Sequence, residues 1–193
     1  METPFFPVSL RQLPSHLAIE ELKDMEFRVG PVEVRSKFAN HPGICVGYRL
    51  ATSSGSIAYF PDNEPYEKLK LLLASGDGIT EEEARNFAGA ERAKMVDFLQ
   101  GCDVVIMDTQ YTEEEYAKHV GWGHSSVNSV VSLALDANVE KLVLFHHDPN
   151  HDDQMIDKMV EQARAFVAKS GKSLEVDAAR EGAEILLDAK VLA

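Results

Sequence analysis

The sequence predicts an α/β (or α+β) layered fold, in which a mixed β-sheet carries helices on one face. Over the first 61 residues, short apolar runs of strand character alternate with turns, as in a meander of antiparallel strands. After Asp62 the pattern changes to helical segments that alternate with single apolar strands. No repeat, low-complexity tract or linker divides the chain, so we treat residues 1–193 as a single domain.

The individual elements follow from turn and capping signals. The turn TSSGS separates two strand-like runs, and the expected antiparallel strands lie within residues 18–23, 25–29, 32–39, 45–51 and 56–61. Pro65 opens a short predicted helix over 65–75, and a capping box from Thr80 to Glu83 starts a longer one. The remaining expected elements are a strand over 102–108, helices over 112–120 and 125–138, a strand over 141–147, a helix over 152–171 and an edge strand over 183–187.

Composition limits the classes of partner. Lys and Arg number 19 against 32 Asp and Glu, and the net charge of -13 argues against a broad surface for phosphates or anionic membranes. No apolar run approaches the roughly 18 residues that span a bilayer, and the first residues lack the features of a signal peptide. Cys45 and Cys102 stand singly, as reduced core thiols do. We therefore expect a soluble, cytoplasmic protein without a membrane partner.

Polar residues that could carry chemistry lie at strand ends and in the loops that follow them, where α/β folds usually build sites. They are His41, Asp62, Asp108, His124, His146 and His147. Each has a simpler alternative: a lone histidine such as His41 is often a surface residue, and Asp62 beside Pro and Asn suits a turn. In the stretch HDD at 151–153, capping of the following helix by Asp152 is favoured over metal binding.

His146 and His147 exclude one another from a single site if both belong to a strand, because successive side chains point to opposite faces. Leu142 and Leu144 are in phase with His146, while Val143 and Phe145 are in phase with His147. Such a strand is buried on both faces, so the pattern alone leaves the choice open.

Five segments in order resemble the later motifs of the metallo-β-lactamase fold hydrolases, in the branch that includes tRNase Z and cyclic phosphodiesterases. They are NHPGICVGYRL, IAYFPDNEP, DVVIMDTQYT, GWGHSS and KLVLFHHDP. The resemblance implies that His41 and His146 each ligate one of two metal ions and that Asp62 bridges the ions. It also implies that His124 donates a proton to the leaving group and that Asp108 orients His124.

The implied chemistry is hydrolysis by a metal-bound hydroxide. Imidazole and carboxylate ligands suit Zn²⁺, and also Mn²⁺ or Fe. Because of the charge, we expect a small phosphodiester or other small-molecule ester as substrate and no long nucleic acid. Trp122, beside the proposed proton donor, could line the substrate pocket or could simply pack.

The signature His-x-His-x-Asp-His, which supplies most metal ligands in this family, does not occur among the 193 residues. The resemblance therefore predicts the C-terminal half of an αββα sandwich, with weak or absent metal binding and no activity in this chain alone. It also predicts a bare sheet face that promotes self-association or binding of a complementing N-terminal half. The alternatives are a non-catalytic binding or scaffold protein that kept this half-fold, and an unrelated α/β domain with structural histidines.

Overall fold

The structure is a computed structural model that describes residues 21, 25–66 and 80–187. Its seven strands form one mixed sheet in the order β1-β2-β3-β4-β5-β6-β7. The first four strands pair antiparallel and the last three join in parallel. The strands are β1 (Glu26–Val29), β2 (Val32–Phe38), β3 (Val46–Thr52), β4 (Gly55–Phe60), β5 (Val104–Asp108), β6 (Lys141–Phe145) and β7 (Glu175–Ala178). The predicted α/β class with a mixed sheet is confirmed.

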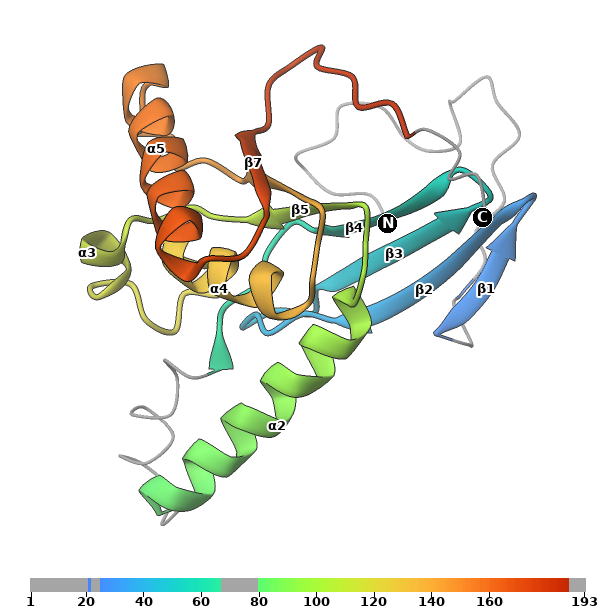
Figure 1. Cartoon of the computed structure of the whole chain (residues 1–193). Helices are drawn as coiled ribbons and strands as arrows, with labels where there is room; N and C mark the ends of the chain where they lie inside the picture. The colour runs from blue at the N-terminus through green and yellow to red at the C-terminus, as the bar shows by residue number, and fades with distance from the viewer. Residues whose placement is uncertain (1–20, 22–24, 67–79, 188–193) are drawn as a thin grey trace, which may run out of the picture.

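Three of the four described helices start at a residue whose side chain accepts a hydrogen bond from a free backbone N–H group. Thr80 and Glu83 form the predicted capping box at the start of the long helix, and Asp152 accepts from the Met155 N–H at the start of the last one. The helices are α2 (Glu81–Leu99), α3 (Glu113–Tyr116), α4 (Val127–Asp136) and α5 (Asp153–Ser170). Figure 1 shows α4 and α5 beside the β5–β7 end of the sheet, with β1 and β2 at the opposite end.

The core lies between the sheet and α2, α4 and α5. Side chains in register across β4, β5, β6 and β7 point toward these helices, which pack on this one face. The inward rows are Ala58, Val105, Leu142 and Val176, followed by Phe60, Met107, Leu144 and Ala178. Because side chains alternate along a strand, the residues between these rows face away from the helices.

Several predicted elements differ from the observed ones. Residues 183–187 form no strand, so the prediction of an edge strand there is wrong; the edge strand is β7, whose polar sequence EVDA gave a weak signal. The helix predicted over 112–120 is shortened to one turn, α3. Two further predictions lie mostly outside the described residues: the strand over 18–23 and the helix over 65–75.

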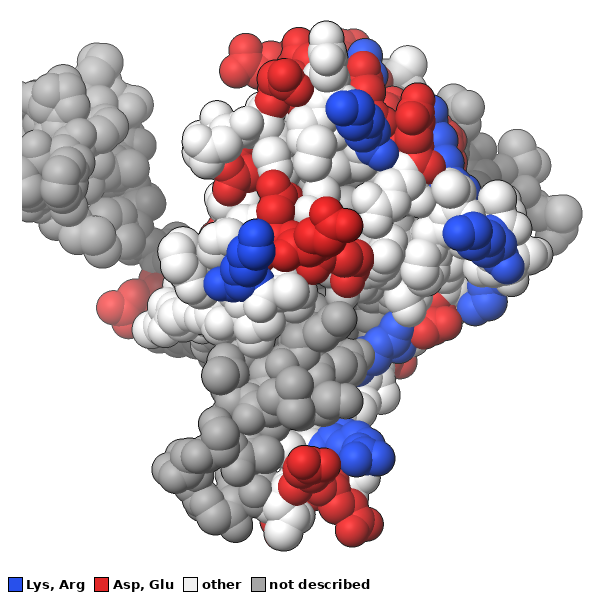
Figure 2. Space-filling model, turned by 90° about the vertical axis from the view of Figure 1, so that its left-hand side faces the viewer, with Lys and Arg blue, Asp and Glu red and all other residues white. Residues whose placement is uncertain are grey.

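The described helices and one face of the surface bear on the expectations about membranes and charge. No described helix is both long enough and apolar enough to cross a bilayer. Figure 2, seen from the side of α3 and α5, shows acidic and basic side chains interspersed, with no continuous basic stripe among the described residues of that face.

Cys45 and Cys102 are both free thiols.

Candidate metal centre

Four of the five predicted site residues meet at one edge of the sheet. Because β4, β5 and β6 are parallel neighbours, their carboxyl ends lie together, and Asp62, Asp108 and His146 stand at or just beyond these ends. His124 returns to the same edge through a loop that is anchored by a backbone bridge between Tyr111 and Ser126. One ligand atom from each of Asp62, Asp108, His124 and His146 lies within 4.8 Å of the others.

Asp62 and His146 form the open side of this group. Nε2 of His146 lies 3.4 Å from Oδ1 of Asp62, and the two side chains remain 39% and 28% exposed, so an ion and a substrate can reach them. The other ring nitrogen of His146, Nδ1, is buried and has no hydrogen-bond partner among the described residues. One imidazole and one carboxylate that face each other are a donor set that fits Zn²⁺, Mn²⁺ or Fe.

Asp108 and His124 form the closed side. Asp108 is completely buried, and its Oδ2 accepts from His124 Nδ1 at 2.7 Å and from the Asn63 N–H at 3.1 Å. Its Oδ1 accepts from the Gln110 N–H at 3.0 Å. With both oxygens engaged, Asp108 is suited to orient His124 rather than to hold an ion.

The hydrogen bond from His124 to Asp108 also shifts the pKa of both side chains. It raises the pKa of His124 above its ordinary value, against the opposing effect of burial. Burial raises the pKa of Asp108, while the hydrogen bonds that it accepts act in the opposite direction. A histidine that keeps its proton at higher pH is suited to act as an acid.

His41 lies beside the four-residue group but is not part of it. Its ring centroid is 5.7 Å from that of His124, and Nδ1 is engaged by the backbone N–H of Gly43 at 3.1 Å. Asn40 connects the loop that carries His41 to the segment that carries Asp62. Its side-chain amide donates to the Glu64 carbonyl, and its backbone carbonyl accepts from the Glu64 N–H. Nε2 is therefore the ring atom through which His41 can act.

His147 does not join the group, but the reason differs from the predicted one. Strand β6 ends at Phe145, so His146 and His147 are not successive strand residues. His146 instead has a left-handed backbone conformation, with φ of 58°, which is unusual for a residue other than glycine. This local turn, and not strand alternation, directs His146 into the group.

Glu64 is a structural organiser of the site that the sequence reasoning missed. It is 2% exposed, yet its carboxylate accepts from Tyr116 Oη at 2.7 Å and from the N–H groups of Gly121 and Gly123 at 2.7 and 2.8 Å. Its place in FPDNEP suggested only a turn, because the three donors come from more than fifty residues away. Glu64 thus holds the loop that leads into His124.

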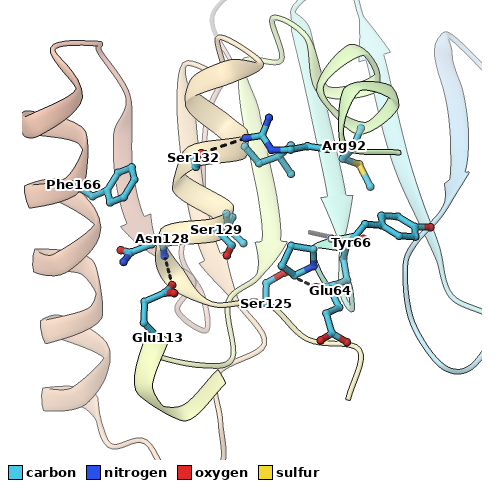
Figure 3. Close-up of a pocket in the computed structure, with 14 residues that line it drawn as sticks. Glu64, Tyr66, Arg92, Glu113, Ser125, Asn128, Ser129, Ser132 and Phe166 are labelled. Atoms are coloured by element: carbon cyan, nitrogen blue, oxygen red, sulfur yellow. Dashed lines mark hydrogen bonds between the residues drawn. The ribbon is translucent and has the colours of Figure 1, made fainter. Parts of the chain in front are cut away.

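A cavity of about 280 Å³ lies behind the metal centre, between α2, α4 and α5 (Figure 3). It is lined by Arg92, Asn128, Ser129 and Phe166, among others, and by none of the five predicted site residues. Ser125 connects it to the centre, since its hydroxyl donates to the Asn63 carbonyl and its N–H faces Asp108. The cavity thus adjoins residues next to the centre but is lined by none of the candidate ligands.

Comparison with known proteins gives consistent sequence and fold similarities. The chain is 38% identical over 78 residues to a ribonuclease Z of Thermoplasma volcanium, covering 40% of this chain and 25% of the relative. It is 22% identical over 160 residues to a ribonuclease Z of Oceanobacillus iheyensis, covering 82% and 46%. The metallo-β-lactamase fold protein YhfI from Bacillus subtilis superposes with a TM-score of 0.60 at 16% identity, covering 86% of this chain and 54% of that one. No family model matches.

These relatives overturn one expectation. A small-molecule substrate and the absence of a nucleic acid partner were predicted from the net charge, whereas the similar proteins are named as ribonucleases. Net charge describes the whole surface and says little about the few contacts made at one edge of a sheet. The prediction that excluded nucleic acid is therefore wrong.

The chain spans between a quarter and about half of the length of the ribonuclease Z relatives described above. The similarity in sequence and the similarity in fold point the same way. The resemblance of this chain to the metallo-β-lactamase fold hydrolases of the tRNase Z branch is confirmed.

Proposed function

We propose that the chain contributes to metal-dependent hydrolysis of a phosphodiester bond in RNA. The observation that carries this proposal is the convergence of Asp62, Asp108, His124 and His146 within 4.8 Å at one sheet edge. The named activity of the ribonuclease Z relatives supports RNA as the substrate class.

In this proposal Asp62 and His146 hold metal, and His41 completes the ligands that this chain offers. A bound metal would activate the attacking water and neutralise charge on the phosphate. We propose Zn²⁺ as the ion, because imidazole and carboxylate are its usual ligands, and Mn²⁺ as a useful substitute in experiments. The Asp62 carboxylate faces both His146, proposed to bind metal, and His124, proposed to donate the proton.

His124 supplies the proton that the leaving oxygen needs. Asp108 holds Nδ1, which leaves Nε2 as the atom that can pass a proton to the leaving oxygen. The hydrogen bond to Asp108 raises the pKa of His124, which favours the protonated ring. Asp108 is itself held by the N–H groups of Asn63 and Gln110, so its hydrogen bond can orient the His124 ring before substrate binds.

We also propose that the chain binds metal weakly. A catalytic zinc ion normally has about three protein ligands, and His41, Asp62 and His146 would have to serve two ions. The resemblance predicted no activity of this chain alone. With Asp62, Asp108, His124 and His146 brought together, we propose instead that turnover by the 193-residue chain is at background in micromolar metal and rises as millimolar Mn²⁺ fills the site by mass action.

The test is cleavage of a fluorogenic single-stranded RNA by the purified chain over a Mn²⁺ series, with Mn²⁺ binding followed by electron paramagnetic resonance. The expected result is metal-dependent cleavage that a chelator abolishes and that the Asp62→Ala variant lacks. Cleavage that is equal in the wild-type chain and in Asp62→Ala would overturn the assignment of the site. Bound Mn²⁺ without cleavage at any concentration would overturn the enzymatic function and favour the non-catalytic binding protein.

A further inference from the structure

The loop before His124 holds an aromatic side chain out into solvent. Trp122 is 61% exposed, although tryptophan is one of the most apolar side chains. It stands between Gly121 and Gly123, whose φ angles of 92° and 93° belong to the left-handed region that glycine adopts readily. The backbone of this loop thus has a defined conformation that turns Trp122 outward.

The buried side chain of Glu64 holds the loop of Trp122 by hydrogen bonds. The buried carboxylate accepts from the N–H groups on both sides of Trp122, those of Gly121 and Gly123. On the far side, Gly123 packs so closely on His41 and Pro42 that a methyl group there would come within 2.3 Å of the His41 ring. The exposed position of Trp122 is therefore built into the fold.

A row of ring contacts connects Trp122 to the metal centre. The rings of Trp122 and His119 meet nearly at right angles with their centroids 4.8 Å apart, and His119 stacks on Tyr111 at 4.6 Å. Tyr111 in turn lies 6.2 Å from the ring of His124. Trp122 is thus the exposed outer end of this row, whose inner end is the proposed proton donor.

We propose that Trp122 is a stacking platform for an unpaired base of the RNA next to the phosphate held at the metal centre. Every base has a flat π-face that stacks on tryptophan, and such contacts tolerate different sequences. An unpaired base is required because a base inside a duplex already has its faces covered. The inference rests on the proposed function for the position of the phosphate, and it makes Trp122 a substrate-positioning residue.

Stacking does not require a basic surface, and the face in Figure 2 shows acidic and basic side chains interspersed, with no continuous basic stripe among its described residues. Stacking is affected less by salt than ion pairing is. We therefore expect RNA affinity to fall only shallowly as salt concentration rises.

Trp122 is the only tryptophan among the 193 residues, so its fluorescence reports on this position directly. The wild-type chain is titrated with a short single-stranded RNA in a chelator, so that hydrolysis cannot occur. The control probe is an oligonucleotide of equal length and phosphate number that lacks bases at the central positions. We expect quenching by the RNA and much weaker quenching by the abasic probe; equal quenching by both would overturn the proposal.

Variants are compared through the fluorescence anisotropy of labelled RNA. Trp122→Ala should weaken affinity roughly tenfold, while Trp122→Phe, which keeps a flat ring, should restore most of it. Phe87 on α2 is the matched control, because it is also an exposed aromatic residue, at 49%, and Phe87→Ala should bind as the wild type does. Unchanged affinity in a folded Trp122→Ala chain would overturn the stacking role.

The outcomes separate this inference from the proposed function. Base-dependent quenching without metal-dependent cleavage would support the platform and overturn the activity. Metal-dependent cleavage without base-dependent quenching would support the activity and overturn the platform.

Discussion

The carboxylate of Glu64 and the N–H of Gly123 are joined by a 2.8 Å hydrogen bond across 59 residues of sequence. This bond connects the segment that carries Asp62 to the loop that carries His124. The two halves of the proposed chemistry, metal binding and proton donation, are thus held together by a residue that has neither role.

Replacement of Glu64 should therefore loosen the site and lower stability. In Glu64→Ala, three donors lose their acceptor, and the two buried ones, Tyr116 Oη and the Gly123 N–H, each cost about 1–3 kcal/mol if water does not reach them. Urea unfolding measures the loss, and a shift in the emission of Trp122 reports the loosened loop. Glu161→Gln, an exposed change on α5, is the control and should leave both readings unchanged.

His124→Ala should separate chemistry from metal binding. The ring is bound to Asp108 and is assigned to proton transfer, so its loss should lower turnover about 10²-fold or more while metal content stays near that of the wild type. Initial rates beside metal analysis by mass spectrometry provide the measurement. A parallel loss of metal would show that His124 is a ligand.

Asp62→Ala should give the contrasting result. Asp62 is the carboxylate that faces His146 on the open side, so its removal should abolish both metal binding and cleavage. Titration with Mn²⁺ gives the affinity directly. Retention of metal with loss of turnover would instead give Asp62 a role in orienting groups.

Gly123→Ala should disturb the site through sterics alone. The new methyl group would lie 2.3 Å from Cδ2 of His41, and φ of 93° disfavours any side chain, so we expect a loss of about 1–3 kcal/mol in stability. Gly89→Ala is the matched control: it lies in α2 with nothing within 4 Å and should gain about 0.5–1 kcal/mol. Thermal unfolding of the two variants should shift in opposite directions.

The contribution of Glu115 to stability should depend on pH. Burial acts to raise its pKa, but hydrogen bonds from His151 and from Thr112 outweigh it and hold the pKa below the ordinary 4.5. A depressed folded-state pKa adds stability above pH 4.5 that is lost as pH falls through the folded-state value. The difference in unfolding free energy between wild type and Glu115→Gln should thus be largest near neutral pH and vanish in acid. A difference that grows on acidification would contradict this sign.

Much of the fold was predictable because strong local signals agreed with tertiary structure. Hydrophobic runs marked β2 to β6, and the capping residues Thr80 and Asp152 marked the helix starts. β7 was missed because its alternation is short and polar, and residues 183–187 misled because an apolar run alone does not supply a pairing strand.

The site was predictable to the extent that parallel strands bring their ends together. That rule groups Asp62, Asp108 and His146. The left-handed turn at His146 and the contacts of buried Glu64 depend on residues distant in sequence, and no local pattern encodes them. The choice of His146 over His147 therefore came from resemblance, and its physical cause became visible only in three dimensions.

The strand order described above has a consequence for how the protein assembles. Each strand hydrogen-bonds to its neighbours in sequence, so the sheet can grow by successive addition and requires only modest loop closures. The loop of His124 has no such advantage, since its fastening to Glu64 needs both β4 and the segment after α3 already in place. We therefore expect the loop of His124 to assemble late and to open early, so that partial unfolding would silence the chemical centre while the sheet remained intact.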